Sequence, residues 1–198
     1  MRHPRRPPRT PPSLPLPLLS LLLLLGLAPC ALPPGGGRWP QGEEALSPLV
    51  EEAALRHGLP PSLVQAVVWK ESRFRPEATG SQGEIGLMQL TPGAMRDWAA
   101  AHGCPTPGRG RAFAPALNLE IGCWYLARAL RRWEGYHSAL VLALAEYNAG
   151  PATVLREWRP ATPDTPLPLE EIPYPETREY IRQILLQKEH YDTRPSAP

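Results

Sequence analysis

The sequence predicts one all-α domain, and three observations support this class. Apolar residues recur at the three- and four-residue spacing of helices in several segments. Prolines, serines and threonines stand where these segments begin, and no segment alternates apolar and polar residues as a half-buried strand does. With 198 residues, the chain can bury the core of one domain but is too short for two ordinary domains with linkers. We therefore expect one helical domain over residues 46–191.

The first 30 residues have the composition of a secretory signal. They hold four arginines and no acidic residue, followed by a leucine-rich run at residues 14–28 that is shorter than the roughly 20 apolar residues needed to span a bilayer. A cleaved signal therefore ranks above a permanent transmembrane helix. The whole chain has 21 Lys and Arg against 19 Asp and Glu. Removal of the signal takes away its four arginines, so 17 basic and 19 acidic residues remain and the protein is close to neutral. That balance gives no support to nucleic-acid binding through phosphate attraction.

The chain has three cysteines, an odd number, so one of them is expected to have a role apart from the other two. Cys30 ends the run Leu-Ala-Pro-Cys, which resembles the bacterial lipoprotein box except that proline stands where a small residue is usual. Lipidation of Cys30 and ordinary cleavage nearby both stay open. Cys104 and Cys123 then remain, either as a disulfide formed in an oxidising compartment or as two buried thiols.

The helices expected along the chain follow a flexible tether. Residues 31–45 are rich in proline and glycine, which predicts a segment that does not pack, and residues 192–198 are expected to form a flexible tail. Between these ends, the capping residues and apolar spacing predict helices at residues 47–57, 61–75, 91–102, 115–133, 138–149, 151–158 and 176–191.

One carboxylate interrupts the apolar face of the second of these helices. Val64, Val67, Val68 and Glu71 share a helical face by their spacing, so Glu71 stands where an apolar residue is expected. A carboxylate in such a place loses hydration, which raises its pKa toward the range that a general acid needs near neutral pH. Glu71 is therefore the first candidate for a catalytic residue.

Five separated motifs resemble, in their order, the lytic transglycosylases of the soluble-transglycosylase (SLT) type. The motifs are Glu71-Ser72 with Phe74 and Pro76, then Gly86-Leu87-Met88-Gln89, then Asn118 with Gly122, Tyr125 and Leu126, then Tyr147-Asn148-Ala149-Gly150-Pro151, and last Ile172-Pro173 followed by Glu176-Thr177-Arg178-Glu179-Tyr180. The resemblance covers residues 46–191 and implies the helical fold of goose-type lysozyme.

The resemblance also implies a reaction and a set of site residues. The family cleaves the β-1,4 bond between N-acetylmuramic acid and N-acetylglucosamine in peptidoglycan and leaves a 1,6-anhydromuramyl end. Glu71 is implied as the single catalytic acid and base, which differs from the two carboxylates of ordinary glycosidases. The implied substrate-binding residues are Ser72, Gly86, Leu87, Met88, Gln89, Tyr147 and Asn148.

Several of these implied roles have a plainer alternative. Tyr147 is expected to hydrogen-bond Glu71, the alternative being a core tyrosine bonded to the backbone. Ser72 either orients the glutamate or satisfies a nearby carbonyl, and Asn148 either lines the groove or caps its helix. Glu146 lies about 100° around the helix from Tyr147, so we expect it to be exposed to solvent.

Two residues depart from the family's usual loop before Gly-Leu-Met-Gln. Gly80 stands in the place of a groove serine, and Glu84 stands where alanine is usual. Because of these departures, a non-catalytic peptidoglycan-binding envelope protein stays open as an alternative function. A hydrolytic lysozyme on the same scaffold is the other alternative.

The sequence and the resemblance together predict a monomer exported to the bacterial cell envelope, in the periplasm or at the outer membrane. Its expected partners are the glycan strands of peptidoglycan, with membrane anchoring if Cys30 is lipidated. The five histidines lie at no metal-ligand spacing, so neither a metal nor another cofactor is implied.

Overall fold

The computed structural model describes residues 39–194, and this part of the chain is helical apart from isolated bridges between extended residues. The all-α prediction is confirmed. The predicted signal, Cys30, most of the tether and the last four residues lie outside the described residues. The elements are α1 (Glu43–Arg56), α2 (Pro61–Ser72), α3 (Pro92–Ala101), α4 (Arg109–Ala112), α5 (Pro115–Arg132), α6 (Ala139–Ala149), α7 (Pro151–Thr153), the π-helical turn η1 (Val154–Trp158), the 3-10 turn η2 (Leu169–Glu171) and α8 (Pro175–Asp192).

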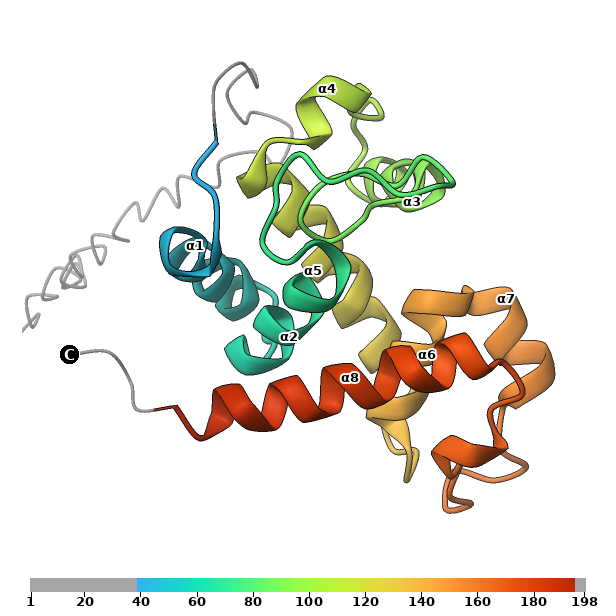
Figure 1. Cartoon of the computed structure of the whole chain (residues 1–198). Helices are drawn as coiled ribbons and strands as arrows, with labels where there is room; N and C mark the ends of the chain where they lie inside the picture. The colour runs from blue at the N-terminus through green and yellow to red at the C-terminus, as the bar shows by residue number, and fades with distance from the viewer. Residues whose placement is uncertain (1–38, 195–198) are drawn as a thin grey trace, which may run out of the picture.

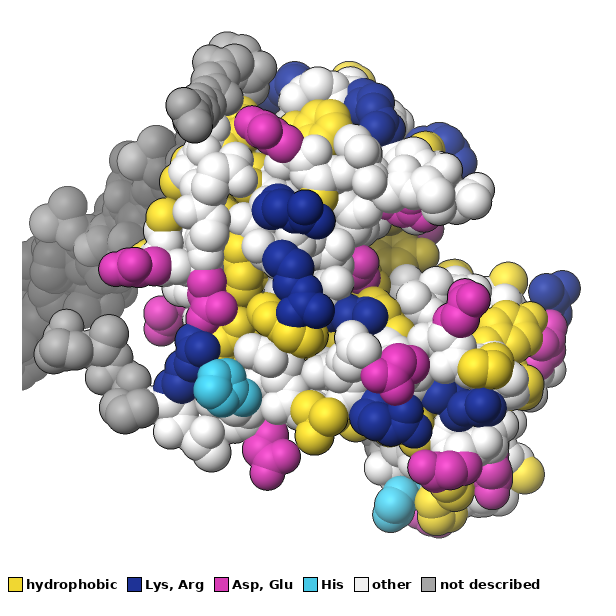
Figure 2. Space-filling model, in the orientation of Figure 1, with side chains coloured by type: hydrophobic (Ala, Val, Ile, Leu, Met, Phe, Trp, Pro, Cys, Tyr) yellow, Lys and Arg dark blue, Asp and Glu magenta, His cyan; other side chains and the backbone are white. Residues whose placement is uncertain are grey.

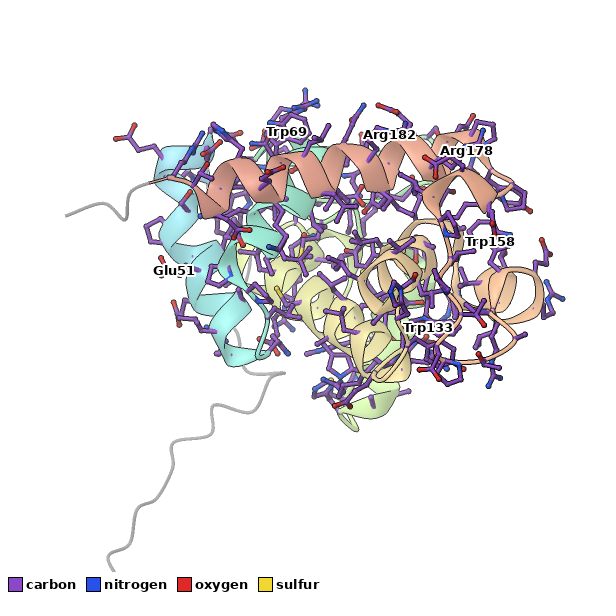
Figure 3. All side chains as sticks on the ribbon, turned by 90° about the horizontal axis from the view of Figure 1, so that it is seen from below. Glu51, Trp69, Trp133, Trp158, Arg178 and Arg182 are labelled. Atoms are coloured by element: carbon purple, nitrogen blue, oxygen red, sulfur yellow. The ribbon has the colours of Figure 1, made fainter. Side chains whose placement is uncertain are left out.

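Helix α5 forms the centre of the domain. It packs against α1, α3 and α6, and its side chains at Leu119, Ile121 and Leu126 are fully buried. The last helix, α8, crosses the molecule and packs on both α2 and α6 (Figure 1; Figure 3). Helix α8 thereby lies against α2 from the first half of the chain. None of the helices at residues 39–194 has the length and hydropathy to cross a membrane.

Helix α2 ends earlier than its predicted limit at residue 75. Its last residue is Ser72, because Arg73 and Phe74 take left-handed backbone conformations with φ of 55° and 56°. Such conformations are rare outside glycine and indicate local strain that the surrounding packing holds in place. Phe74 is buried and anchors this break in the core. As a result, Glu71 lies in the last turn of α2.

Helix α1 begins at Glu43, before the predicted start at Ser47 and inside the segment expected to be a tether. The acidic side chains of Glu43 and Glu44 in the first turn favour this start through the helix dipole. The Ser47 hydroxyl donates to the Glu43 carbonyl (2.8 Å) instead of capping the helix. Just before α1, the Gly42 amide donates to the Phe74 carbonyl (3.2 Å), which holds this segment beside the end of α2.

The regions around α3, α4 and α6 can also be compared with the predictions from the sequence. Thr91 caps α3 as expected, since its hydroxyl accepts a hydrogen bond from the Ala94 amide (3.1 Å). Ser138 precedes α6 but does not cap it, because its hydroxyl accepts a hydrogen bond from the Leu167 amide (2.9 Å) in the proline-rich loop. Residues 103–114, where no regular structure was expected, contain the single turn α4.

Of the two alternatives left open for Cys104 and Cys123, a disulfide between them is excluded, because Cys123 is free. Cys123 is a free thiol on the buried side of α5, and burial raises its pKa to about 12.

Candidate active site

The Glu71 carboxylate lies at the end of α2 and is mostly shielded from water. Its Oε1 accepts a hydrogen bond from the Tyr180 hydroxyl over 2.6 Å. Burial raises the pKa of Glu71 to about 7, while the hydrogen bond from Tyr180 and the charge of Lys70 lower it and the charge of Glu84 raises it. Protonated and ionised forms are therefore both populated near neutral pH. A group in that state can give up a proton and take one back.

The hydrogen-bond partner of Glu71 differs from the expected one. The Tyr147 hydroxyl donates to the Met88 carbonyl over 2.9 Å, so the alternative of a tyrosine bonded to backbone is correct. Tyr180 of α8 takes the expected position instead. Burial and the charge of Glu71 raise the pKa of Tyr180 well above its usual value, so its hydroxyl remains a donor. The sequence carried a signal for this role, because Tyr180 closes the last of the five motifs.

Two hollows that share Gln89 form a groove beside Glu71. A hollow of about 420 Å³ contains the catalytic candidate and is lined by Gln41, Glu71, Arg75, Glu77, Ala78, Thr79 and Gln89. A second hollow of about 250 Å³ is lined by Gln89, Leu90, Thr91, Ala94, Tyr125, Tyr147, Asn148, Ala149 and Gly150. Figure 2 shows a hollowed face between the part of the molecule that carries α3 and the part that carries α6 and α7.

Only some of the predicted substrate-binding residues line this groove. Gln89, Tyr147 and Asn148 do. Leu87 and Met88 do not, because their side chains are fully buried in the core. Met88 packs against Gly122 of α5, where a Cβ would lie 2.3 Å from the Met88 sulfur.

Ser72 and Gly86 also serve the structure rather than the groove surface. The buried Ser72 hydroxyl donates to the Val68 carbonyl (3.2 Å), which is the plainer of its two expected roles. Gly86 has φ of 78°, and a Cβ there would lie 2.1 Å from Asn118 Nδ2. The tight approach of Gly86 to α5 therefore requires a residue without a side chain.

Asn118 fixes the groove wall from the inside. Its Oδ1 accepts from the Met88 amide (2.8 Å), and its Nδ2 donates to the carbonyls of Ile85 (3.0 Å) and Ala112 (2.8 Å). Antiparallel bridges join Ile85 to Thr79 on one side and to Leu90 on the other. The wall is thus a small ordered fold clamped to α5 by one buried amide, and it sets the position of Gln89.

Gln89 is held in one orientation at the point where the two hollows meet. Its Nε2 donates to the carbonyls of Ala78 (3.2 Å) and Gly86 (2.9 Å). The backbone of Gln89 has φ of 46°, an uncommon value for a side chain of this size. The Gln89 amide oxygen lies on the side of Gly80, 2.9 Å from the place of a Cβ at that residue.

Glu146 is not the exposed residue that the helical angle predicted. Its carboxylate is fully buried and accepts hydrogen bonds from Trp133 Nε1 (2.9 Å) and Arg132 Nε (3.2 Å). Figure 3 shows Trp133 near the end of α5, next to α6. All residues of α6 from Leu142 to Glu146 are buried. The 100° between Glu146 and Tyr147 therefore did not place Glu146 on an exposed side of the helix. Glu146 thus connects α6 to the end of α5. The carboxylate that accepts a hydrogen bond from Tyr180 is that of Glu71.

The described residues offer no arrangement for a metal ion. Within residues 39–194, no three His, Cys, Asp or Glu side chains gather in a way that could hold one.

Comparison with known proteins points to one family. The family described as "Transglycosylase SLT domain" matches residues 48–163. The soluble lytic murein transglycosylase of Salmonella typhimurium is 31% identical over 134 residues, which are 66% of this chain and 20% of that protein. The membrane-bound lytic murein transglycosylase C of Actinobacillus pleuropneumoniae is 35% identical over 115 residues, which are 55% of this chain and 32% of that protein.

Solved structures agree with these sequence relatives. An inactive mutant of the lytic transglycosylase Slt from Pseudomonas aeruginosa superposes with a TM-score of 0.64 at 32% identity, over 73% of this chain and 23% of the other. The 70-kDa soluble lytic transglycosylase in complex with bulgecin A has a TM-score of 0.63 at 26% identity, over 75% of this chain and 24% of the other. The chain spans about a fifth to a third of the length of these relatives. Since the family match covers more than half of the chain, this protein belongs to the transglycosylase SLT domain family.

Proposed function

We propose that this protein is a peptidoglycan lytic transglycosylase that cleaves the β-1,4 bond between N-acetylmuramic acid and N-acetylglucosamine. The observation that carries the proposal is the Glu71 carboxylate, which burial and Tyr180 hold at the groove with a pKa of about 7. Relatives named lytic murein transglycosylases support the proposal. The proposed reaction uses one group that acts first as an acid and then as a base. Glu71 has the protonation behaviour for both steps.

The proposed reaction requires only one carboxyl group, and no water molecule takes part in it. Protonated Glu71 gives its proton to the glycosidic oxygen, and the bond from that oxygen to the muramyl anomeric carbon breaks. The 6-hydroxyl of the same muramyl residue then attacks the anomeric carbon and passes its proton to the Glu71 carboxylate. The products are a free 4-hydroxyl on N-acetylglucosamine and a 1,6-anhydromuramyl end, and Glu71 returns to its protonated form.

Tyr180 and the groove walls would position the reacting groups. The hydrogen bond from Tyr180 occupies Oε1 of Glu71, which leaves Oε2 for proton transfer. On the other side of Gln89, the rings of Tyr125 and Tyr147 lie in a T-shaped contact with centroids 6.0 Å apart, and both line the groove. Aromatic walls with a few fixed polar groups suit the apolar faces and hydroxyls of sugars.

The proposed setting is the bacterial cell envelope. Residues 1–30 would act as the export signal, and the helical domain would act on glycan strands outside the cytoplasm. Relatives named soluble and membrane-bound lytic murein transglycosylases support such a location. Lipidation of Cys30 is tested by metabolic labelling with a fatty acid, in which Cys30→Ala should lose a label that the wild type carries.

Digestion of purified sacculi followed by mass analysis of the released muropeptides tests the activity. Anhydromuramyl ends are the expected products. Reducing ends would instead identify a hydrolytic lysozyme, and binding without release would identify a non-catalytic peptidoglycan-binding protein. Glu71→Gln should abolish release and retain the fold, whereas Glu51→Gln, which changes an exposed carboxylate on α1 (Figure 3), should release products like the wild type. Full activity of Glu71→Gln would refute the mechanism.

A further inference from the structure

The two residues that depart from the family's loop pattern, Gly80 and Glu84, meet in space. A Cβ at Gly80 would lie 2.2 Å from Oε2 of Glu84 and 3.0 Å from its Cδ. The Glu84 carboxylate thus occupies the volume that the side chain of a serine at position 80 would need. The departures are therefore one coupled exchange, in which a carboxylate from position 84 replaces a hydroxyl from position 80.

A tight turn keeps the Glu84 carboxylate in this place. The Gln82 amide donates to Oε2 of Glu84 (2.9 Å), and the Gly80 amide donates to the Glu84 carbonyl (2.9 Å). The Gly83 amide closes the turn on the Gly80 carbonyl (3.2 Å). These hydrogen bonds fix the position of the Glu84 carboxylate on the turn.

Two acceptor groups meet beside Gly80. Besides Glu84, the amide oxygen Oε1 of Gln89 lies 2.9 Å from the same Cβ position, and the two carbonyl partners of its nitrogen fix that orientation. Glu71 is close enough for its charge to interact with that of Glu84. Gln89 and Glu71 both line the larger hollow of the groove. A charged acceptor and a neutral acceptor on one wall match a cationic donor best.

The one basic side chain in the lining of that hollow, Arg75, is engaged elsewhere. Its Nε donates to the Ser72 carbonyl (2.9 Å) at the end of α2. Arg75 therefore extends from the α2 end of the hollow, whereas Glu84 and Gln89 belong to the wall formed by residues 79–90. The turn also has a cation beside it, because Arg109 Nη1 donates to the Gly83 carbonyl (2.6 Å).

We infer that Glu84 is a specificity-determining residue of the groove, whose carboxylate accepts a hydrogen bond from an ammonium group of the substrate. The inference rests on the proposed function. An ammonium group on peptidoglycan has two sources, the 2-amino group of an N-deacetylated sugar and a free amine of a peptide stem. Either one can make a charge-assisted hydrogen bond to Glu84, which a neutral acetamide cannot equal.

Rates on three substrates test this role and separate the two sources. The substrates are acetylated strands freed of stems, the same strands after partial N-deacetylation, and acetylated strands that keep their stems. We expect Glu84→Gln to lower kcat/KM on an ammonium-bearing substrate by at least about tenfold more than on the bare acetylated strand, the size of a hydrogen bond to a charged group. A selective loss on deacetylated strands identifies the sugar amine, and a selective loss on stem-bearing strands identifies the stem amine.

Substitution of Gly80 provides an independent route to the same result. Gly80→Ser places a Cβ 2.2 Å from the present Glu84 oxygen, so it must displace the carboxylate and lose selectivity as Glu84→Gln does. The double variant Gly80→Ser with Glu84→Ala removes this clash. It should unfold at a higher temperature than Gly80→Ser alone while still lacking the selectivity.

An equal change in kcat/KM on all three substrates would overturn the inference, because a residue that only packs the turn affects every substrate alike. Failure of the proposed function has a different signature, namely a wild-type protein that cleaves none of the substrates. In that case the same comparison is made on the binding affinity for the three strands, and Glu84→Gln must still weaken binding of an ammonium-bearing strand selectively.

Discussion

Tyr180 of α8 donates its hydroxyl proton to Oε1 of Glu71 at the end of α2, across a sequence separation of 109 residues. The docking of α8 on α2 makes this contact possible, and Lys70 supports it by donating to Gln183 (2.9 Å). Residue 180 lies beyond the segment matched by the family, which ends at residue 163. The orientation of the catalytic candidate therefore depends on a helix that the matched segment does not include.

Replacing Tyr180 with phenylalanine should change the pH dependence of muropeptide release. The hydrogen bond from Tyr180 lowers the pKa of Glu71, so its loss raises that pKa above its present value of about 7. The alkaline limb of the activity profile, where the acid loses its proton, should move to higher pH. A looser carboxylate should also lower kcat by about 10- to 100-fold. Tyr174→Phe, at a tyrosine that is 46% exposed, is the matched control. An unchanged profile in Tyr180→Phe would mean that the hydroxyl does not act on Glu71.

Neutralising Glu71 should stabilise the fold at alkaline pH. The pKa of Glu71 is raised from 4.5 to about 7 on folding, so the folded state holds the proton more tightly than the unfolded state. Below pH 4.5 both states are protonated and no difference arises. As the pH rises to about 7, the unfolded state loses its proton first and the wild type loses up to about 3 kcal/mol of stability.

Glu71→Gln escapes this loss, so its urea midpoint should exceed that of the wild type at pH 8 and equal it at pH 4. Glu51→Gln should match the wild type at both values. Equal midpoints for Glu71→Gln and the wild type at pH 8 would show that burial of Glu71 carries no energetic cost.

Adding one methyl group at Gly122 should disturb the groove wall. A Cβ there would lie 2.3 Å from the Met88 sulfur and 2.8 Å from Met88 Cβ, and the latter cannot move without the backbone of the wall. Overpacking costs about 1–3 kcal/mol and outweighs the roughly 1 kcal/mol that alanine gains over glycine in a helix. We expect Gly122→Ala to lower both the free energy of unfolding and the rate of release. Gly110→Ala, in the open turn α4 with no atom within 4 Å, should lower neither.

Removing the buried amide of Asn118 should detach the wall from α5. Asn118→Ala leaves the Met88 amide and the Ala112 carbonyl without their partner, whereas the Ile85 carbonyl keeps its hydrogen bond from the Leu90 amide (2.9 Å). Unpaired buried groups of this kind cost about 1–3 kcal/mol, so denaturant unfolding should show a loss of roughly 2–4 kcal/mol. Asn148→Ala, at an exposed residue with one hydrogen bond from the Thr177 hydroxyl, should cost less than about 1 kcal/mol. Similar losses in the two variants would contradict the clamp.

Local patterns were sufficient for the helices and for the candidate acid. The starts at Pro61, Thr91 and Pro115 could be read from the sequence, because a cap or a first-turn proline acts within one helical turn. Glu71 could be singled out for the same reason, since an apolar face is a property of one helix. The start of α1 at Glu43 instead of Ser47 could not be predicted from the sequence. The segment before it is held by the hydrogen bond between Gly42 and Phe74, which are far apart along the chain.

The sequence by itself thus determined an all-helical domain and one carboxylate on an apolar face, and the structure bears both out. Only the tertiary structure decided that Tyr180 rather than Tyr147 holds Glu71, that Leu87 and Met88 turn into the core, and that Glu84 fills the space over Gly80. Helical periodicity and capping depend on neighbours along the chain. The partner of a side chain depends on how distant helices rotate and dock, which no local pattern encodes.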